Sequence, residues 1–380
     1  MRPIPALLLA SCLGLPSLTS QAWAEPAEAR VSEAARQVMQ QYNIPGMAIA
    51  ITENGRQHFY NYGIASRDTR QSVSSETLFE LGSISKTFTA TLATDAQARA
   101  KLNLNDKTRQ YLPQLAGTPF GEIMLQHLAT HSAGGFPLQV PDAVQDERQL
   151  IDYLKAWQPQ YPPGSQRTYA NPSIGMLGLL TARALDMPFV SAMQQHVFNP
   201  LGLSNTYLDI PADKRALYAQ GYDKQDAPIR LKGGVLGNEA YGVKSSSKDM
   251  LRFIEANLNP QQLSKPLAAA VTQTHVGYLT FGPVTQDLIW EQYAYPVKLK
   301  TLLAGNANTM AYETQPATAL DPVMPAQQNV WINKTGSTNG FGGYVAFIPG
   351  QARGIVILAN KNYPNEARVK LAYTLLGEAE

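Results

Sequence analysis

The 380-residue chain contains a single cysteine, Cys12. One cysteine excludes an intramolecular disulfide framework and any zinc site that is built from several thiolates. Cys12 lies in an N-terminal segment with the features of an export signal, so the mature protein is expected to contain no thiol. A chain of this length buries enough apolar surface to fold without disulfide bonds.

The chain also lacks an excess of charge of either sign. It has 31 Lys and Arg residues against 29 Asp and Glu residues, which gives a net charge of +2. No basic stripe stands out, and this argues against nucleic acid as a partner. After the N-terminal segment no apolar run approaches the roughly 18 residues that a membrane span needs. We therefore expect a monomer of one large domain or two interleaved ones, without a nucleic-acid or membrane partner.

The N-terminal residues have the pattern of a signal peptide. Arg2 is the only charge before Glu25, an apolar run extends through Leu15, and Ala22-Trp23-Ala24 offers an A-x-A cleavage site. Cleavage after Ala24 leaves residues 25–380 as the mature chain. The alternative is a lipoprotein signal, because Leu9-Ala10-Ser11-Cys12 resembles a lipobox. The apolar region before Cys12 is short for that alternative, since such regions span about 7–15 residues.

Strand patterns gather at the two ends of the chain. After an amphipathic helix over residues 31–43, Asn54-Gly55 separates two strand-like runs and predicts a β-hairpin. Near the C-terminus three more strand-like runs precede a closing helix. The runs expected as strands are 46–51, 57–62, 330–333, 343–348 and 354–358, and the closing helix is expected over 366–380.

Helical patterns and loops dominate the middle of the chain. The simplest architecture is an α+β fold whose antiparallel sheet is built from both termini and flanked by helices. We expect the sheet part over residues 25–82 and 282–380, and a mostly helical inserted region over residues 83–281. The cleft between the two parts is the expected binding site.

The first motif with catalytic chemistry is Ser83-Ile84-Ser85-Lys86, which follows Gly82. A serine in the first turn of a helix lies near free backbone amides, and Lys86 shares its face. A desolvated lysine can act as a base and activate the hydroxyl. The alternative is that Ser83 only caps the helix. The same S-x-x-K pattern recurs at Ser245-Ser246-Ser247-Lys248, where Ser246 or Ser247 is expected to cap a helix.

The second motif is Tyr169-Ala170-Asn171, and Y-x-N recurs at Tyr363-Pro364-Asn365. A free phenol has a pKa of about 10 and is a poor base at neutral pH. Two nearby lysines, for which Lys86 and Lys334 are the candidates, would lower that pKa. Asn171 followed by Pro172 is also a strong helix start, so Asn171 alternatively serves only as an N-cap.

The third motif is Lys334-Thr335-Gly336-Ser337, at the end of a strand-like run. A lysine that points inward from a buried strand is costly unless it meets an anion, which indicates an anionic substrate. Glycine at 336 would permit a substrate to approach the backbone closely. The alternative is a surface lysine before a turn.

Metal chemistry is not indicated. His127 and His131 are spaced to share a helix face, but the chain has no H-E-x-x-H motif and no third ligand nearby in sequence. We interpret both as structural and predict no metal or cofactor. The absence of G-x-S-x-G argues against an α/β-hydrolase.

In this order the three motifs resemble those of the serine penicillin-recognising enzymes, and specifically of the class C, AmpC-type β-lactamases. The similarity extends from the signal peptide to the C-terminal helix. The segments that carry it are 79–86, 133–142, 239–244, 334–348 and 359–365. The resemblance implies hydrolysis of cephalosporins and penicillins, antibiotic resistance and a periplasmic location.

The resemblance also implies roles for particular residues. Ser83 would be acylated, Lys86 and Tyr169 would share the proton transfers, and the backbone amides of Ser83 and Ser337 would form the oxyanion hole. The family leaves open which of Lys86 and Tyr169 is the acylation base. The residues implied to contact substrate are Lys334, Thr335, Asn365 and Arg368 near its carboxylate, Gln139 and Asn171 at its side-chain amide, Tyr241 at the pocket wall, and Gly336.

A few positions depart from the family pattern. Asn333 stands where many members have histidine, Gly237 and Asn238 precede a loop where an acidic residue is common, and Asn339 replaces a frequent glycine. We expect these departures to change which substrates are accepted and to leave the core chemistry unchanged. The rival functions are a D-alanyl-D-alanine carboxypeptidase or serine esterase of the same superfamily, and a penicillin-binding sensor module.

Overall fold

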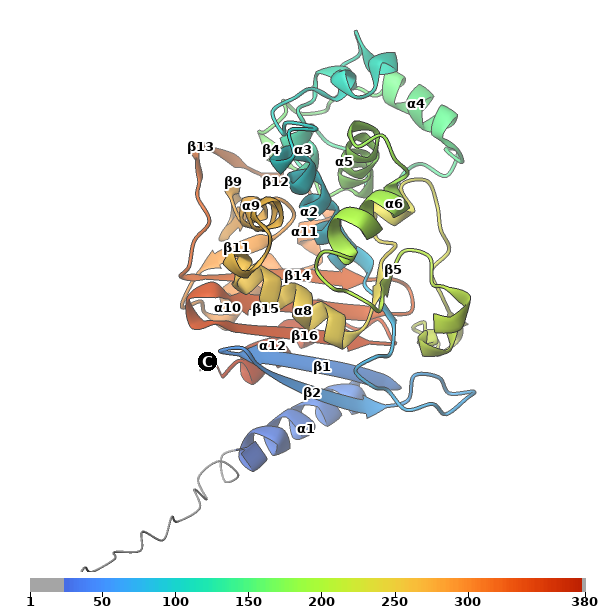
Figure 1. Cartoon of the computed structure of the whole chain (residues 1–380), viewed down its shortest axis with the longest axis vertical. Coiled ribbons are helices and arrows are strands. Elements are labelled where there is room, and N and C mark those ends of the chain that lie inside the picture. Colours follow the sequence, from blue (N-terminus) through green and yellow to red (C-terminus); the bar gives the residue numbers. More distant parts are fainter. Residues whose placement is uncertain (1–23, 378–380) are drawn as a thin grey trace, which may run out of the picture.

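A nine-stranded sheet is the centre of the computed structural model, which describes residues 24–377 (Figure 1). Every pair of neighbouring strands in it is antiparallel. In spatial order the strands are β13 (Thr318–Met324), β9 (Gly277–Phe281), β10 (Val284–Gln286), β11 (Glu291–Ala294), β14 (Val330–Ser337), β15 (Gly342–Ile348), β16 (Arg353–Ala359), β1 (Gly46–Glu53) and β2 (Arg56–Gly63).

The two ends of the chain meet at the pairing of β1 with β16, which runs from Met47 opposite Ala359 to Glu53 opposite Arg353. The predicted β-hairpin forms on the other side of β1. Asn54 and Gly55 have φ values of 51° and 78°, as a two-residue hairpin turn with positive φ at both positions requires. The expected α+β fold with a sheet built from both termini is therefore confirmed.

Successive side chains of each strand point to opposite faces of the sheet, and helices cover both faces. Met47 and Ile49 of β1 pack with residues of α1 (Ala24–Gln41) and α12 (Asn365–Leu375), which cover one face. Ala48 and Ala50 pack with residues of α2 (Ser85–Ala98), α8 (Ser247–Leu258) and α9 (Lys265–Thr274) on the other face. A third apolar cluster fills the helical region around α3 (Leu125–Ala129), α4 (Glu147–Ala156) and α5 (Asn171–Ala184), at the top of Figure 1.

The helices are α1 (Ala24–Gln41), α2 (Ser85–Ala98), α3 (Leu125–Ala129), α4 (Glu147–Ala156), α5 (Asn171–Ala184), α6 (Phe189–Met193), α7 (Gly237–Ala240), α8 (Ser247–Leu258), α9 (Lys265–Thr274), α10 (Leu299–Gly305), α11 (Thr309–Tyr312) and α12 (Asn365–Leu375). Small two- and three-stranded sheets join β4 (Gln166–Arg167) to β12 (Gln315–Pro316), β3 (Phe79–Glu80) and β5 (Thr206–Tyr207) to β8 (Lys244–Ser245), and β6 (Gly221–Tyr222) to β7 (Pro228–Ile229).

The division into a sheet part and a helical part remains an expectation, and one of its boundaries differs from the sheet's extent. Strand β9 at Gly277–Phe281 belongs to the large sheet but precedes residue 282. The predicted leader lies outside the described residues except for Ala24. In residues 24–377 no single helix is long and apolar enough to cross a membrane, and only the bent pair Asn171–Ala184 with Phe189–Phe198 meets that test together.

The hairpin turn gives a stability test with a matched control. Gly55→Ala adds a methyl group that meets no neighbour within 4 Å, so its cost comes only from the positive φ of 78°. We expect a loss of about 1 kcal/mol in the free energy of unfolding, measured by urea titration. Gly233→Ala, also without a neighbour within 4 Å and without a positive φ, should lose nothing. Equal changes in the two variants would contradict the turn assignment.

Candidate active site

The predicted site residues meet in one cleft of about 730 Å³ between β14 and the helical region. The predicted residues that line it are Ser83, Gln139, Tyr169, Asn171, Tyr241, Lys334, Thr335, Gly336, Ser337, Asn365 and Arg368. Lys86 is fully buried directly beneath Ser83. Motifs that are far apart in the chain therefore converge on a single cavity.

Ser83 lies in a 3₁₀ turn, Gly82–Ile84, immediately before α2, and its side chain makes no helix-capping hydrogen bond. The capping interpretation is therefore wrong. Gly82 has a φ of +52°, and a Cβ atom there would overlap the backbone of Ser337. A Cβ atom at Gly336 would likewise overlap the carbonyl oxygen of Leu81. Glycine at 336 therefore leaves room for the 3₁₀ turn that carries Ser83. This close packing brings the backbones at Ser83 and Ser337 together.

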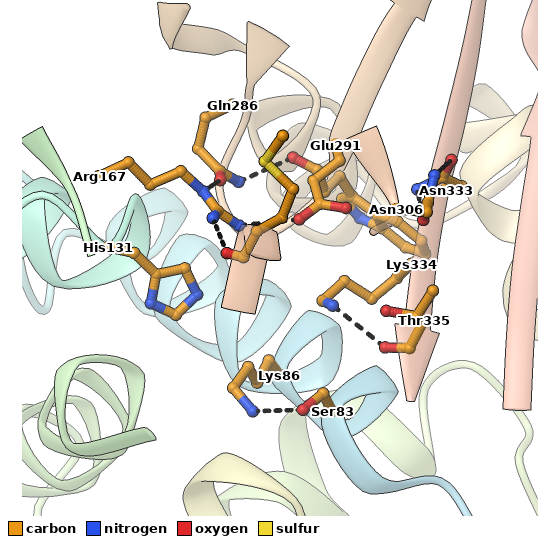
Figure 2. Close-up of polar contacts among 12 residues, drawn as sticks. Ser83, Lys86, His131, Arg167, Gln286, Glu291, Asn306, Asn333, Lys334 and Thr335 are labelled. Carbon is orange, nitrogen blue, oxygen red and sulfur yellow. Dashed lines mark hydrogen bonds and ion pairs between the residues drawn. The ribbon is translucent and has the colours of Figure 1, made fainter. Parts of the chain in front are cut away.

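The Lys86 ammonium connects the nucleophile to a backbone carbonyl. Its Nζ donates to Ser83 Oγ at 2.8 Å (Figure 2). It also donates to the carbonyl oxygen of Ala240 at 2.9 Å. Burial lowers the pKa of Lys86 to about 8; Tyr169 opposes that shift and Lys334 adds to it. A lysine with such a pKa can exchange a proton with Ser83 at neutral pH.

Tyr169 is the residue on which the cations of the site converge. The Nζ atoms of Lys86 and Lys334 lie 5.2 Å and 5.3 Å from its ring centroid. Burial alone would raise the pKa of this phenol, but Lys334 and Lys86, with hydrogen bonds from Ser83 and Lys86, bring it down to about 8. The expectation that these two lysines flank the phenol is confirmed, and the phenolate form is accessible near neutral pH.

Neither lysine is neutralised by a carboxylate. In residues 24–377 the hydrogen-bond partners of Lys86 and Lys334 are the hydroxyl groups of Ser83 and Tyr169 and two backbone carbonyls. Arg167, whose Cζ lies 5.4 Å from the Tyr169 centroid, differs because Glu291 pairs with it at 2.9 Å (Figure 2). The cleft therefore holds buried positive charge that favours an anionic ligand.

Asn171 and Gln139 form a polar pair on the helical side of the cleft. Asn171 Nδ2 donates to Gln139 Oε1 at 2.9 Å. Asn171 is the first residue of α5 and its N-cap position is occupied by Ala170, so the expectation of an Asn171 cap is wrong by one residue. Asn171 Oδ1 is buried and has no hydrogen-bond partner in the described part of the chain.

Arg368 is placed differently from a substrate-facing cation. Its side chain is fully buried, and Nη1 donates to the carbonyl of Gly336 at 2.7 Å and to Ser337 Oγ at 2.9 Å. Nη2 is held by Asn362 and by the carbonyl of Tyr363. The guanidinium thus braces the strand end that carries Ser337, while its predicted contact with a substrate carboxylate remains a prediction.

Several neighbours of the site were given no role in it by the sequence. The ring centroid of His131, which we interpreted as structural, lies 4.3 Å from that of Tyr169. Burial holds its pKa well below the usual range, so it is neutral. The only sequence signal that could have placed Arg167 at the site is its position two residues before Tyr169. A backbone acceptor such as Ala240 leaves no trace in a residue pattern.

The structure also shows where two of the departures from the family pattern lie and what the second S-x-x-K motif does. Asn333 is fully buried and bonds Asn306 and Tyr344 rather than facing the cleft, whereas Asn339 lines it. At the second motif Ser246 Oγ accepts from the backbone of Asp249 at 3.2 Å, as a helix cap.

Comparison with known proteins agrees with this geometry. The β-lactamase family model matches residues 31–380. A β-lactamase from Lysobacter lactamgenus is 47% identical over 377 residues, which are 98% of this chain and 98% of the relative. A β-lactamase/D-alanine carboxypeptidase from Pseudomonas syringae is 59% identical, with a TM-score of 0.92 over 93% of this chain and 99% of its own. A class C β-lactamase solved with cefoxitin is 44% identical, with a TM-score of 0.90 over 93% and 98%.

The chain belongs to the β-lactamase family. Within that family several of its structural neighbours are class C enzymes, and the chain is a class C serine β-lactamase.

The position of Arg368 gives a test that separates two roles. Arg368→Met leaves several buried acceptors unpaired, so we expect a loss of about 3 kcal/mol in the free energy of unfolding. Because Ser337 loses its brace, kcat/KM should fall about 10-fold for a cephalosporin and for a carboxylate-free acyl ester alike. Arg353→Met, which removes an exposed ion pair with Glu53, is the control. A loss confined to the carboxylate-bearing substrate would instead identify Arg368 as a carboxylate ligand.

Proposed function

We propose that Ser83 Oγ attacks the carbonyl carbon of the β-lactam ring and forms an acyl-enzyme that water then hydrolyses. The observation that carries this proposal is the Ser83–Lys86 hydrogen bond of 2.8 Å beneath a phenol whose pKa is lowered to about 8. The Ser83 proton passes to the coupled pair of Lys86 and Tyr169. The two groups share these transfers, since they titrate as one system.

The oxyanion that forms on the carbonyl is bound by the backbone amides of Ser83 and Ser337. The proposal is supported by the close contact between the Gly82 turn and the Ser337 backbone, which leaves no room for a side chain at 82 or 336. Removal of one such donor typically costs about 10²–10³-fold in kcat. Backbone donors fixed by this packing need no rearrangement when charge develops on the oxygen.

The substrate carboxylate binds at Lys334 and Thr335, with Asn365 close by. Lys334 is 2% exposed, and its ammonium donates a hydrogen bond to the carbonyl of Thr335 at 3.1 Å. An anion at this point compensates a buried charge that the described residues leave unpaired. On the other side Asn171 and Gln139 hold the side-chain amide, and Tyr241 forms the wall beside them.

The phenol of Tyr169 also takes part in the hydrolysis of the acyl-enzyme. When the ring opens, Tyr169 delivers a proton to the departing nitrogen. It then accepts a proton from the hydrolytic water as that water attacks the ester, and that proton passes to Ser83 Oγ as the ester bond breaks. Both steps need a group that gains and loses a proton near neutral pH. The pKa of about 8 for Tyr169 suits that task.

A second candidate function is the hydrolysis of acyl-D-alanyl-D-alanine peptides. It is favoured by the relative from Pseudomonas syringae, which is described as both β-lactamase and D-alanine carboxypeptidase. Such peptides end in a carboxylate, which Lys334 would bind in the same way. We also propose export to the periplasm after cleavage at Ala24, and action as a monomer that confers resistance to β-lactam antibiotics.

The test is turnover of a chromogenic cephalosporin by purified residues 25–380. We expect many turnovers per molecule, and a loss of at least about 10³-fold in kcat in Ser83→Ala, with no acyl adduct in its mass spectrum. Ser245→Ala, at the second S-x-x-K motif, is the matched control and should turn over normally. A single stoichiometric burst with an adduct stable for hours would identify a sensor, and fast peptide cleavage with little β-lactam turnover would identify a carboxypeptidase.

A further inference from the structure

The Lys86 ammonium donates to the carbonyl of Ala240 and to the nucleophile Ser83, and its third polar neighbour is the hydroxyl of Tyr169. A flexible lysine side chain points where its acceptors hold it. The position of the Ala240 carbonyl therefore decides whether Nζ lies within reach of Ser83 Oγ. Ala240 ends α7, a helix of four residues, Gly237–Ala240. So short a helix cannot fix its own position, and its neighbours must do so.

One neighbour is Thr89 of α2, one helical turn after Lys86. Thr89 Oγ1 donates to the carbonyl oxygen of Glu239 at 2.6 Å, and Thr89 is 1% exposed. Residues three apart lie on one face of a helix, so α2 contacts two successive carbonyls of α7, one through Thr89 and one through Lys86. The hydroxyl of Thr89 is thus a fixed donor beside the movable donor of Lys86.

The other neighbour is α5, which offers two glycines on the face that α7 covers. A Cβ atom at Gly178 would lie 2.8 Å from Cβ and Cγ of Glu239 and 3.0 Å from Thr89 Cγ2. A Cβ atom at Gly175 would lie 2.7 Å from Cβ of Leu236, just before α7. Only glycine at both positions lets the segment pack this deeply between α5 and α2.

We propose that Thr89, Gly175 and Gly178 are positioning residues that hold the Ala240 carbonyl in place and thereby orient Lys86 for proton transfer with Ser83. The inference rests on the proposed role of Lys86. The same clamp also places Tyr241, which follows Ala240 and lines the cleft. Residues on α2 and α5 thus control the orientation of the Lys86 ammonium through α7.

The direct test replaces the hydroxyl of Thr89 with a methyl group. In Thr89→Val the Glu239 carbonyl loses its donor, so α7 shifts and Lys86 loses its acceptor. We expect kcat/KM to fall about 10-fold through a lower kcat. Because Lys86 loses a partner that favours its charged form, its pKa should fall, and the acid limb of the pH profile should move to lower pH by about 0.5 pH unit. Thr89→Ser, which keeps the hydroxyl, should restore both.

Thr91→Val is the matched control, since Thr91 is buried on the same helix and its hydroxyl bonds only the carbonyl of Thr87, at 2.8 Å. Its kcat/KM and acid limb should stay those of the unaltered enzyme. Burial raises the pKa of the Glu239 carboxyl to about 7, so the profile is repeated in a Glu239→Gln background to exclude titration of that group. Equal behaviour of Thr89→Val and Thr91→Val would overturn the proposal, as would a loss that leaves the acid limb unmoved.

Gly178→Ala provides a second route if Thr89→Val does not fold. It should displace α7 without removing any hydrogen-bonding side chain, and should reproduce the lower kcat and the moved acid limb; a folded variant with normal kcat would overturn the proposal. Failure here is distinct from failure of the proposed function. If Ser83→Ala abolishes turnover while the Thr89 and Gly178 variants are normal, only the positioning role is wrong.

Discussion

Two buried ammonium groups held against one phenol are the constraint on which the site depends. Lys86 and Lys334 lie 5.2 Å and 5.3 Å from the ring centroid of Tyr169, and no carboxylate of the described residues neutralises them. Burying an unpaired charge is unfavourable, and the fold sustains it because hydroxyl and carbonyl oxygens accept from both groups. The uncompensated charge lowers the pKa of the phenol and attracts an anionic substrate.

The architecture serves this constraint by joining three distant segments. Strand β14 supplies Lys334 from the middle of a sheet made by both chain ends. The 3₁₀ turn before α2 supplies Ser83, and the first turn of α2 supplies Lys86. The backbone of β14 contacts the backbone of the turn before α2 only because residues 82 and 336 are glycine. The helical region adds Tyr169 and the Ala240 carbonyl. The rigid sheet and helices therefore hold the reacting groups in place before substrate arrives, which is what electrostatic catalysis requires.

Sequence patterns predicted the groups that react better than the groups that hold them. Ser83, Lys86, Tyr169 and Lys334 carry side-chain chemistry in short motifs, and the α+β fold followed from strand patterns at both ends. The support was less visible. The expected cap at Asn171 was wrong because Ala170 occupies the N-cap position. The packing of Gly336 against Leu81 was not predicted, because it is a long-range backbone contact. The Ala240 carbonyl and the buried Arg368 have no pattern that reports their partners.

The central claim is that the lysines lower the pKa of Tyr169, and it is tested most directly by titrating that phenol. Tyrosine labelled with ¹³C at Cζ is observed by NMR in the unliganded enzyme, and Tyr169→Phe assigns the signal. The account predicts an inflection at a pH of about 8, well below the value of about 10 of a free phenol. An inflection at 10 or above would show that burial outweighs the two lysines, and would contradict the account.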